Sequence, residues 1–260
     1  MVRSEFAGCE TLSPMKIIQT PSPNFNERTL PISLLVLHYT GMETGGAALE
    51  RMCDPDAKVS AHYMVSETGE ISQMVAEKDR AWHAGVSSWG GETNINSASI
   101  GIEIVNGGHD YGLPDFPRTQ IDAVIGLCSA VMKRHNIPDI GVVAHSDIAA
   151  DRKEDPGEKF PWQTLAKEGV GYWPDLEADG DTRCLFASGA RDRGVAIMQS
   201  GLAYLGYDVE ITGVIDGKTM KTITAFQRRY RPQNIGGIID VQTMEILTHL
   251  IQNKQKRGHG

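Results

Sequence analysis

Two short apolar runs, each followed directly by a histidine, constrain the fold of this chain most strongly. The run Leu34–Leu37 precedes His38, and the run Gly141–Ala144 precedes His145. An unbroken apolar run of this length is typical of a strand that is buried on both faces of a sheet. We therefore expect an α/β domain in which a central mixed sheet is flanked by helices, with both histidines at strand ends.

Periodicity and turn residues predict the other elements of this domain. Apolar residues recur at three- and four-residue spacing over 118–135, which predicts a helix that lies against the sheet. Residues 61–65 and 71–75 are expected to pair as a hairpin, because Glu67–Glu70 between them holds a glycine. The remaining expectations are an irregular lead-in over 10–32, a strand over Ile100–Asn106 and short helices over Ala47–Met52 and Trp162–Lys167.

A loop after the second histidine carries a third candidate metal ligand, Asp155, just before Pro156-Gly157, a pair that stops a helix. Two imidazoles at strand ends and one loop carboxylate form a three-ligand set for zinc. Such a set leaves the fourth position open, as catalytic zinc sites do. Either histidine alone is more often a structural residue, and the ligand types do not separate zinc from related metals.

Five segments occur in the order found in one enzyme family: His38–Thr40, Ala81–Gly85, Ser99–Glu103, Ala144–Ile148 and Arg152–Gly157. Together they resemble the zinc N-acetylmuramoyl-L-alanine amidases of the AmpD and AmiD type, over roughly residues 30–175. The resemblance implies a fold like that of peptidoglycan-recognition proteins. It also implies hydrolysis of the amide between N-acetylmuramic or anhydro-muramic acid and L-alanine of the stem peptide. In this family pattern, His38, His145 and Asp155 hold Zn²⁺.

Glu103 interrupts an otherwise apolar strand, and a carboxylate there is costly unless it is paired or lies near a cation. The resemblance gives Glu103 the role of the base that takes a proton from the attacking water. It gives Lys153 the role of the cation that stabilises the developing oxyanion. The structural alternative is a salt bridge of Glu103 with Arg80 or Lys153.

The segment around His83 lines the substrate groove in the family that this chain resembles. We therefore expect Trp82 and His83 to contact sugar or peptide, with Arg80 as a further substrate contact. Asn106 follows Glu103 on the same strand and is expected to form hydrogen bonds with substrate amides. The alternative for Trp82 is a role in the core.

After a segment rich in Pro, Gly and Asp, the sequence shows helical patterns and no strand patterns. We expect a catalytic domain over 1–178, a linker over 179–189 and a helical domain without strands over 190–260. Within the last domain, Gly213–Thr219 is echoed by Gly237–Thr243, and each copy places an Asp where it can cap a helix. With the helix expected over 196–207 and the basic segment 225–230, this domain resembles the three-helix peptidoglycan-binding domain of wall hydrolases. A dimerisation or stability domain is the alternative.

Charge and hydropathy limit the classes of partner that this chain can bind. Residues 1–185 carry a net charge of −12 and residues 186–260 a net charge of +4, so nucleic acid is disfavoured and a carboxylate-rich cell wall fits the second part. No apolar run approaches the ~20 residues that span a bilayer, so we expect a soluble chain that binds peptidoglycan or muropeptides. The wall-binding domain favours the periplasm, whereas the lack of a recognisable signal peptide favours the cytoplasm.

Phe6–Cys9 resembles the end of a lipoprotein signal, but Arg3–Glu5 leave no room for an apolar region, so lipidation of Cys9 requires a longer precursor. A non-catalytic peptidoglycan-recognition protein is the alternative to an amidase. No ligand position is missing, however, and Glu103 would be superfluous in a receptor. A zinc peptidase is disfavoured because there is no His-Glu-x-x-His helix. Intact sacculus and soluble anhydro-muropeptide both stay open as substrates, and so does the oligomeric state.

Overall fold

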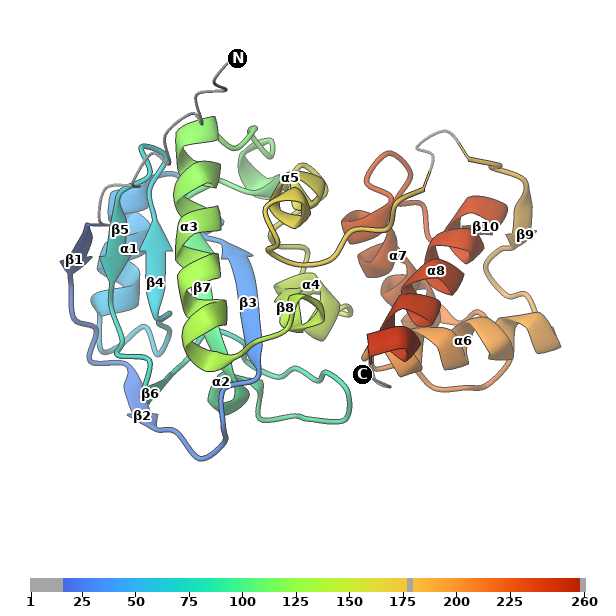
Figure 1. Ribbon diagram of the computed structural model, residues 1–260, viewed down its shortest axis with the longest axis horizontal. Helices are drawn as coiled ribbons and strands as arrows, with labels where there is room; N and C mark the ends of the chain where they lie inside the picture. The colour runs from blue at the N-terminus through green and yellow to red at the C-terminus, as the bar shows by residue number, and fades with distance from the viewer. Residues whose placement is uncertain (1–15, 177–179, 258–260) are drawn as a thin grey trace, which may run out of the picture.

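The computed structural model describes residues 16–176 and 180–257, which form two units that lie side by side (Figure 1). The first unit is built on a six-stranded mixed sheet. In spatial order its strands are β1 (Ile17–Gln19), β5 (Ile71–Gln73), β4 (Tyr63–Val65), β7 (Ser99–Ile104), β3 (Leu34–Tyr39) and β8 (Val142–Ala144). Only the β4–β5 pair is antiparallel among these neighbours, and it forms the predicted hairpin. The predicted mixed α/β sheet is confirmed.

The two faces of the sheet are covered by different elements. The long helix α3 (Arg118–His135) and the short helix α5 (Trp162–Lys167) pack on the face that carries Leu35 and Leu37. The opposite face, which carries Val36, is covered by α1 (Gly45–Cys53), α2 (Ile95–Ala98) and α4 (His145–Ile148), together with the loop before α2. Two short 3₁₀ helices complete the unit, η1 (His109–Tyr111) and η2 (Asp139–Gly141).

The predicted helix over 118–135 matches α3 at both ends. Asn136 ends it in the left-handed conformation, with φ of 54°, and its backbone N–H donates to the carbonyl of Met132. Asparagine tolerates this conformation better than most residues, so it closes the helix in place of glycine. Ile121, Val124, Leu127, Cys128 and Val131 form the buried stripe of α3.

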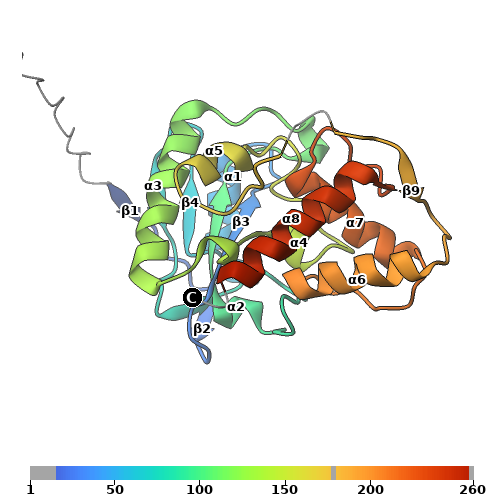
Figure 2. The same ribbon diagram turned by 45° about the vertical axis from the view of Figure 1, so that its right-hand side comes forward.

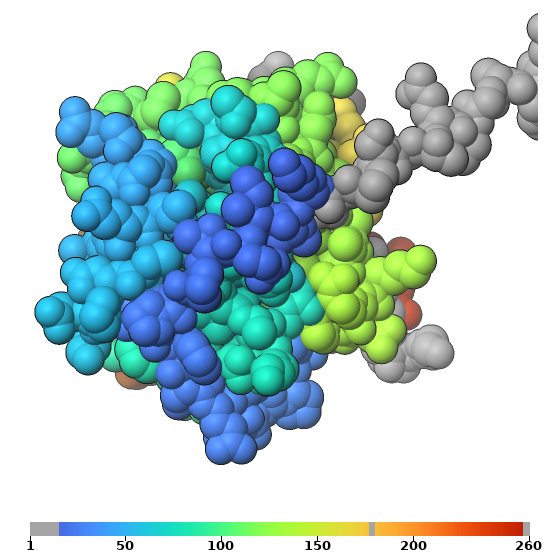
Figure 3. Space-filling model, turned by 90° about the vertical axis from the view of Figure 1, so that its left-hand side faces the viewer, coloured from blue at the N-terminus to red at the C-terminus, as the bar shows by residue number. Residues whose placement is uncertain are grey.

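The expectation of an irregular lead-in over 10–32 is wrong for two of its segments. Ile17–Gln19 is the edge strand β1 beside β5, and β2 (Phe25–Glu27) pairs antiparallel with β6 (Asp79–Ala81). These segments lie across the face of the molecule that points away from the second unit (Figure 3). Pro21 and Pro23 lie between the two strands, so neither removes an N–H from a ladder, and backbone pairing with distant partners decides the structure.

The second unit packs three helices around one core, α6 (Arg193–Leu205), α7 (Gly217–Tyr230) and α8 (Val241–Arg257), as Figure 2 shows. The two repeats begin helices as predicted, because the carboxylates of Asp216 and Asp240 accept from the backbone N–H of Thr219 and Thr243. This three-helix arrangement is confirmed.

The expectation that the C-terminal part lacks strands is wrong. Cys184–Phe186, inside the predicted linker, forms strand β9 and pairs antiparallel with β10 (Ile239–Asp240). Strands of two or three residues carry no periodic pattern that a sequence reading could detect. The domain boundaries stay a prediction, and Cys9 lies outside the described residues. Among the described residues, no helix is long and apolar enough to cross a membrane.

Candidate metal centre

Three neighbouring strands bring the predicted site residues to one edge of the sheet. β3 lies between β7 and β8 and is parallel to both, and His38 lies opposite Glu103 in the register of the β3–β7 pair. On the other side, β8 ends at Ala144, and His145 is the first residue of α4. The expectation that this strand ends on the histidine is therefore wrong by one residue. The carboxylate of Asp147 accepts from the N–H of Ala144 at 2.8 Å, which starts the helix there.

His38, His145 and Asp155 converge, as the sequence predicted. The Nδ1 atoms of the two histidines are 2.9 Å apart, and Oδ2 of Asp155 lies 3.1 Å from Nδ1 of His38 and 2.9 Å from Nδ1 of His145. All three side chains are at most 5% exposed. The Asp155 loop is tied to α4 because its carbonyl accepts from the N–H of Ser146 at 2.9 Å.

Hydrogen bonds on the far side of each ring fix which nitrogen carries the proton. Nε2 of His145 lies 3.1 Å from the carbonyl of Ala84, which can only accept, so Nε2 is the donor. Nε2 of His38 lies 3.1 Å from Nδ1 of His83, which accepts because Nε2 of His83 donates to the hydroxyl of Ser99. Burial and, next, the neighbouring His145 lower the pKa of His38 to about 4, so this ring is neutral. Both rings therefore turn Nδ1 toward each other and toward Asp155.

This arrangement fits a bound cation. Burial opposes ionisation of Asp155, but the two imidazoles outweigh it and hold the pKa of this carboxyl well below its usual range. The three donor atoms lie within 4.8 Å of one another, and the negative charge of Asp155 is buried among them, which favours a positive charge at their centre. Two imidazole nitrogens and one carboxylate oxygen are ligands that zinc accepts.

His83 lies beneath His38 rather than on a rim that could hold substrate. It is 6% exposed, and its Nε2 is 3.3 Å from the hydroxyl of Ser99, which itself donates to the carbonyl of Ile95. Gly101 makes room for the ring, because a Cβ there would lie 2.4 Å from Cγ of His83. Both ring nitrogens are thus engaged inside the protein. We therefore replace the expected substrate contact of His83 by a role in orienting His38.

Glu103 is partly buried, and one of its carboxylate oxygens has no hydrogen-bond partner among the described residues. Its Oε2 is buried and accepts no hydrogen bond, and no ion pair to Glu103 forms within residues 16–176 and 180–257. The expected alternative, a salt bridge with Arg80 or Lys153, is therefore absent from this part of the chain. Burial raises the pKa of Glu103 well above its ordinary value, the charge of Asp155 raises it further, and the charge of Lys153 lowers it.

The other predicted substrate residues are spread around the site. The side chains of Arg80 and Trp82 both donate to Oδ1 of Asn26 in β2, at 3.0 and 2.7 Å. The amide of Asn106 is engaged on both sides, because it donates to the carbonyl of Pro114 at 2.8 Å and accepts from the N–H of Gly108 at 2.9 Å. The Asn106 side chain therefore holds its own loop, and the hydrogen bond to substrate amides stays a prediction.

A groove of about 1100 Å³ runs between the two units. One wall holds Arg80 and the segment Gly85–Ser88, and the other holds Lys218 and Lys221 of α7. Its floor is formed by residues 147–151, which follow the histidine at the start of α4. Arg80 is thus the one of the nine predicted site residues that lines this groove, among the described residues.

Comparison with known proteins agrees with this geometry. The family model described as N-acetylmuramoyl-L-alanine amidase matches residues 28–158, and the model of a peptidoglycan binding domain matches residues 191–247. The N-acetylmuramoyl-L-alanine amidase AmiD of Escherichia coli (strain K12) is 37% identical over 236 residues, which cover 85% of this chain and 83% of that protein. The 1,6-anhydro-N-acetylmuramyl-L-alanine amidase AmpD of Haemophilus influenzae is 35% identical over 165 residues, covering 56% of this chain and 88% of that protein.

Solved structures match both units together. The complex of AmiD from E. coli with the substrate anhydro-N-acetylmuramic acid-L-Ala-D-gamma-Glu-L-Lys has a TM-score of 0.72 and 34% identity, covering 90% of this chain and 93% of that one. AmpDh3 from Pseudomonas aeruginosa in complex with anhydromuramic pentapeptide has a TM-score of 0.71 and 30% identity, with 98% and 99% covered. The chain therefore belongs to the N-acetylmuramoyl-L-alanine amidase family, and its C-terminal unit is a peptidoglycan-binding domain.

Proposed function

We propose that this enzyme uses a zinc ion held by His38, His145 and Asp155 to cleave the amide between N-acetylmuramic, or anhydro-muramic, acid and L-alanine of the stem peptide. The observation that carries this proposal is the convergence of two imidazole nitrogens and one carboxylate beside Glu103, of which Oε2 has no partner among the described residues. Zinc, when bound, supplies Lewis-acid polarisation and lowers the pKa of water to about 7. Three protein ligands leave the position that this chemistry needs.

Glu103 is the proposed general base. Its position beside His38 in the sheet register lets its carboxylate take the proton of the attacking water and pass it to the nitrogen of the leaving L-alanine. The raised pKa of Glu103 suits a group that must both accept and release a proton near neutral pH. Lys153 supplies positive charge where the carbonyl oxygen becomes negative, since its charge already acts on both Glu103 and His38.

Peptidoglycan and its muropeptide fragments are the proposed partners, and the cell envelope is the proposed place of action. Support comes from the match of residues 191–247 to the peptidoglycan binding domain family. An enzyme that acts only on small soluble fragments gains nothing from a unit that holds the polymer. Fractionation of the producing cell tests the location, and recovery of the enzyme in the cytoplasmic fraction alone would contradict it.

The function is tested by digesting purified sacculi and a soluble muramyl-tripeptide, with products identified by mass spectrometry. We expect free stem peptide from both substrates, loss of activity with a chelator and recovery with zinc. Cleavage of the soluble substrate alone would show that intact peptidoglycan is not a substrate. Binding of sacculi without cleavage in any metal condition would refute the amidase and leave a recognition protein.

Glu103→Gln tests the proposed base. Turnover should fall by about 10²–10⁴-fold, the usual contribution of a general base, while zinc stays bound. Glu50→Gln on the exposed side of α1 is the matched control and should behave like the unaltered enzyme. Loss of zinc in Glu103→Gln would show that Glu103 maintains the metal centre instead of moving a proton.

A further inference from the structure

Two consecutive arginines of α7, Arg228 and Arg229, reach out of the peptidoglycan-binding domain into the amidase domain. They are only 6% and 2% exposed, although a basic helix that binds an anionic wall should present its charges to solvent. α7 packs directly against α4, the short helix that begins with His145. Figure 1 shows α7 as the helix of its domain that faces α4 and α5.

Arg229 holds the segment that carries His145. Its NH1 donates to Oδ2 of Asp147 at 2.5 Å, and its NH2 donates to the carbonyl of Val142 in β8 at 2.7 Å. Its guanidinium lies over the ring of Trp162 in α5, 4.3 Å from the ring centre. A planar guanidinium can make these hydrogen bonds and this stacking contact together, which a lysine cannot.

Asp147 connects this arginine to the metal ligand two residues before it. The carboxylate is 1% exposed and also accepts from the N–H of Ala144, which fixes the first turn of α4. Its Oδ1 accepts from the hydroxyl of Tyr207, another residue of the peptidoglycan-binding domain, at 2.7 Å. Burial and then the charge of Asp147 raise the pKa of Tyr207 well above its ordinary value, so the hydroxyl remains a donor.

Arg228 holds the segment that carries the third ligand. Its NH2 lies 3.0 Å from Oε1 of Glu154, the residue before Asp155, and its Nε lies 3.4 Å from Oε2 of Glu158. Glu158 in turn bonds to His109 at 3.0 Å. The two arginines therefore contact the segments that carry His145 and Asp155, and these segments are joined to each other through the N–H of Ser146.

We infer that α7 positions two of the three metal ligands, so that the peptidoglycan-binding domain is part of the scaffold of the metal centre. Arg229 and Tyr207 act on His145 through Asp147, and Arg228 acts on Asp155 through Glu154. A geometric change at one ligand lowers the affinity of a three-ligand site, because the donors no longer converge. This role rests on the proposed metal site and adds to it a dependence on the other domain.

The test measures zinc affinity of the full-length protein by competition with a chromophoric chelator. Arg229→Gln should bind zinc about tenfold more weakly, with Arg228→Gln affected in the same direction. Arg229→Lys should recover part of the loss, because it restores the charge beside Asp147. The ligand-field absorption of the Co²⁺-loaded protein should change in Arg229→Gln, since it reports the coordination geometry.

Arg231→Gln is the matched control. Arg231 is 4% exposed and forms a buried ion pair with Asp240 inside its own domain, at the same 2.5 Å as the pair of Arg229. Its loss should lower stability without changing zinc affinity. Equal zinc affinity in Arg229→Gln, Arg231→Gln and the unaltered protein would overturn the positioning role, whereas an unaltered protein without zinc affinity would overturn the metal centre itself.

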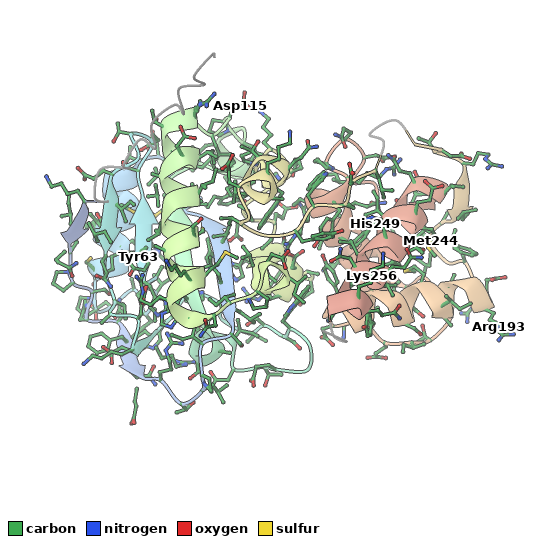
Figure 4. All side chains as sticks on the ribbon, in the orientation of Figure 1. Tyr63, Asp115, Arg193, Met244, His249 and Lys256 are labelled. Atoms are coloured by element: carbon green, nitrogen blue, oxygen red, sulfur yellow. The ribbon has the colours of Figure 1, made fainter. Side chains whose placement is uncertain are left out.

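Tyr207→Phe keeps the test decisive if Arg229→Gln does not fold. The variant removes one hydrogen bond to Asp147 and leaves the ring in the core, so the domain interface persists. Zinc affinity should fall severalfold, and an unchanged affinity would contradict the role of Asp147. Arg193→Gln serves as a surface control, because Arg193 lies at the outer end of α6, away from the amidase domain (Figure 4).

Discussion

A methyl group added at Gly101 tests the packing of His83 beneath the metal centre. The Cβ of an alanine would lie 2.4 Å from Cγ of His83 and 2.6 Å from its Nδ1. Carbon atoms in contact are at least about 3.5 Å apart, so the ring must move by about 1 Å. Nδ1 of His83 is the atom that accepts the hydrogen bond from Nε2 of His38, so this bond is lost or bent.

Two effects of Gly101→Ala can be estimated separately. Overpacking of a buried site costs about 1–3 kcal/mol, which for a protein of this size lowers Tm by about 2–12 °C. Loss of the partner that orients a metal-binding histidine costs about 10–100-fold in metal affinity. The first effect concerns the whole domain, whereas the second concerns only the metal centre.

The assay combines thermal unfolding of the metal-free protein with zinc competition. Gly46→Ala is the control, because Gly46 is an exposed residue of α1 and an added Cβ meets no atom within 4 Å. It should leave zinc affinity unchanged and stabilise the protein slightly, by about 0.5–1 kcal/mol. A Gly101→Ala protein with normal Tm and normal zinc affinity would refute the packing of His83. A lowered Tm with normal affinity would show that His83 does not orient His38.

Two further variants test the catalytic cation and the fold. Lys153→Met should lower kcat by about 10²–10³-fold with zinc affinity unchanged, because Lys153 supplies charge and is not a ligand; a parallel loss of zinc would contradict this role. Burial alone would raise the pKa of Glu77, but hydrogen bonds from Arg134, His135 and Tyr63 lower it to about 2. This stabilisation, about 3 kcal/mol, is complete above the ordinary pKa of 4.5 and is lost as the pH falls toward 2. In urea unfolding, Glu77→Gln should therefore destabilise the protein more at about pH 6 than at about pH 3. Equal losses at both values would show that the ion pairs contribute nothing.

The three proposed metal ligands were predictable because local sequence indicates the strands and the loop that carry them. Apolar runs predict β3 and β8 as buried strands, and because the two are parallel neighbours, their carboxyl ends lie at the same edge of the sheet. His38 and His145 must then lie close together, and a loop that returns past this edge brings Asp155. Helix α3 was likewise predictable, because its apolar periodicity can be recognised without knowing which elements it packs against.

The surroundings of the ligands were not predictable, because they depend on contacts between distant segments. The sequence singles out His83 but does not show that the missing side chain of Gly101 leaves space for its ring. Asn106 lies on the expected strand, yet its side chain forms hydrogen bonds within the loop that follows. The carbonyl of Ala84 accepts from Nε2 of His145, and because every residue has a backbone carbonyl, the sequence does not indicate this contact.

The arginines of α7 show the same limit between domains. A basic pair at the end of an amphipathic helix is compatible with wall binding and with a buried interface. The partners of Arg228 and Arg229 lie 74 and 82 residues earlier in the chain. Only the fold reveals that these partners are Glu154, next to the proposed ligand Asp155, and Asp147, two residues after the proposed ligand His145.

These two kinds of support act on different ligands, and a double variant can separate them. Gly101→Ala acts on His38 through His83, whereas Arg229→Gln acts on His145 through Asp147. If each substitution displaces only its own ligand, the losses in zinc-binding free energy should add within about 0.5 kcal/mol. If both merely loosen the amidase domain, the second substitution should cost much less than it does alone. Zinc competition on the two single variants and the double variant distinguishes these cases, and strong non-additivity would refute independent positioning of the two histidines.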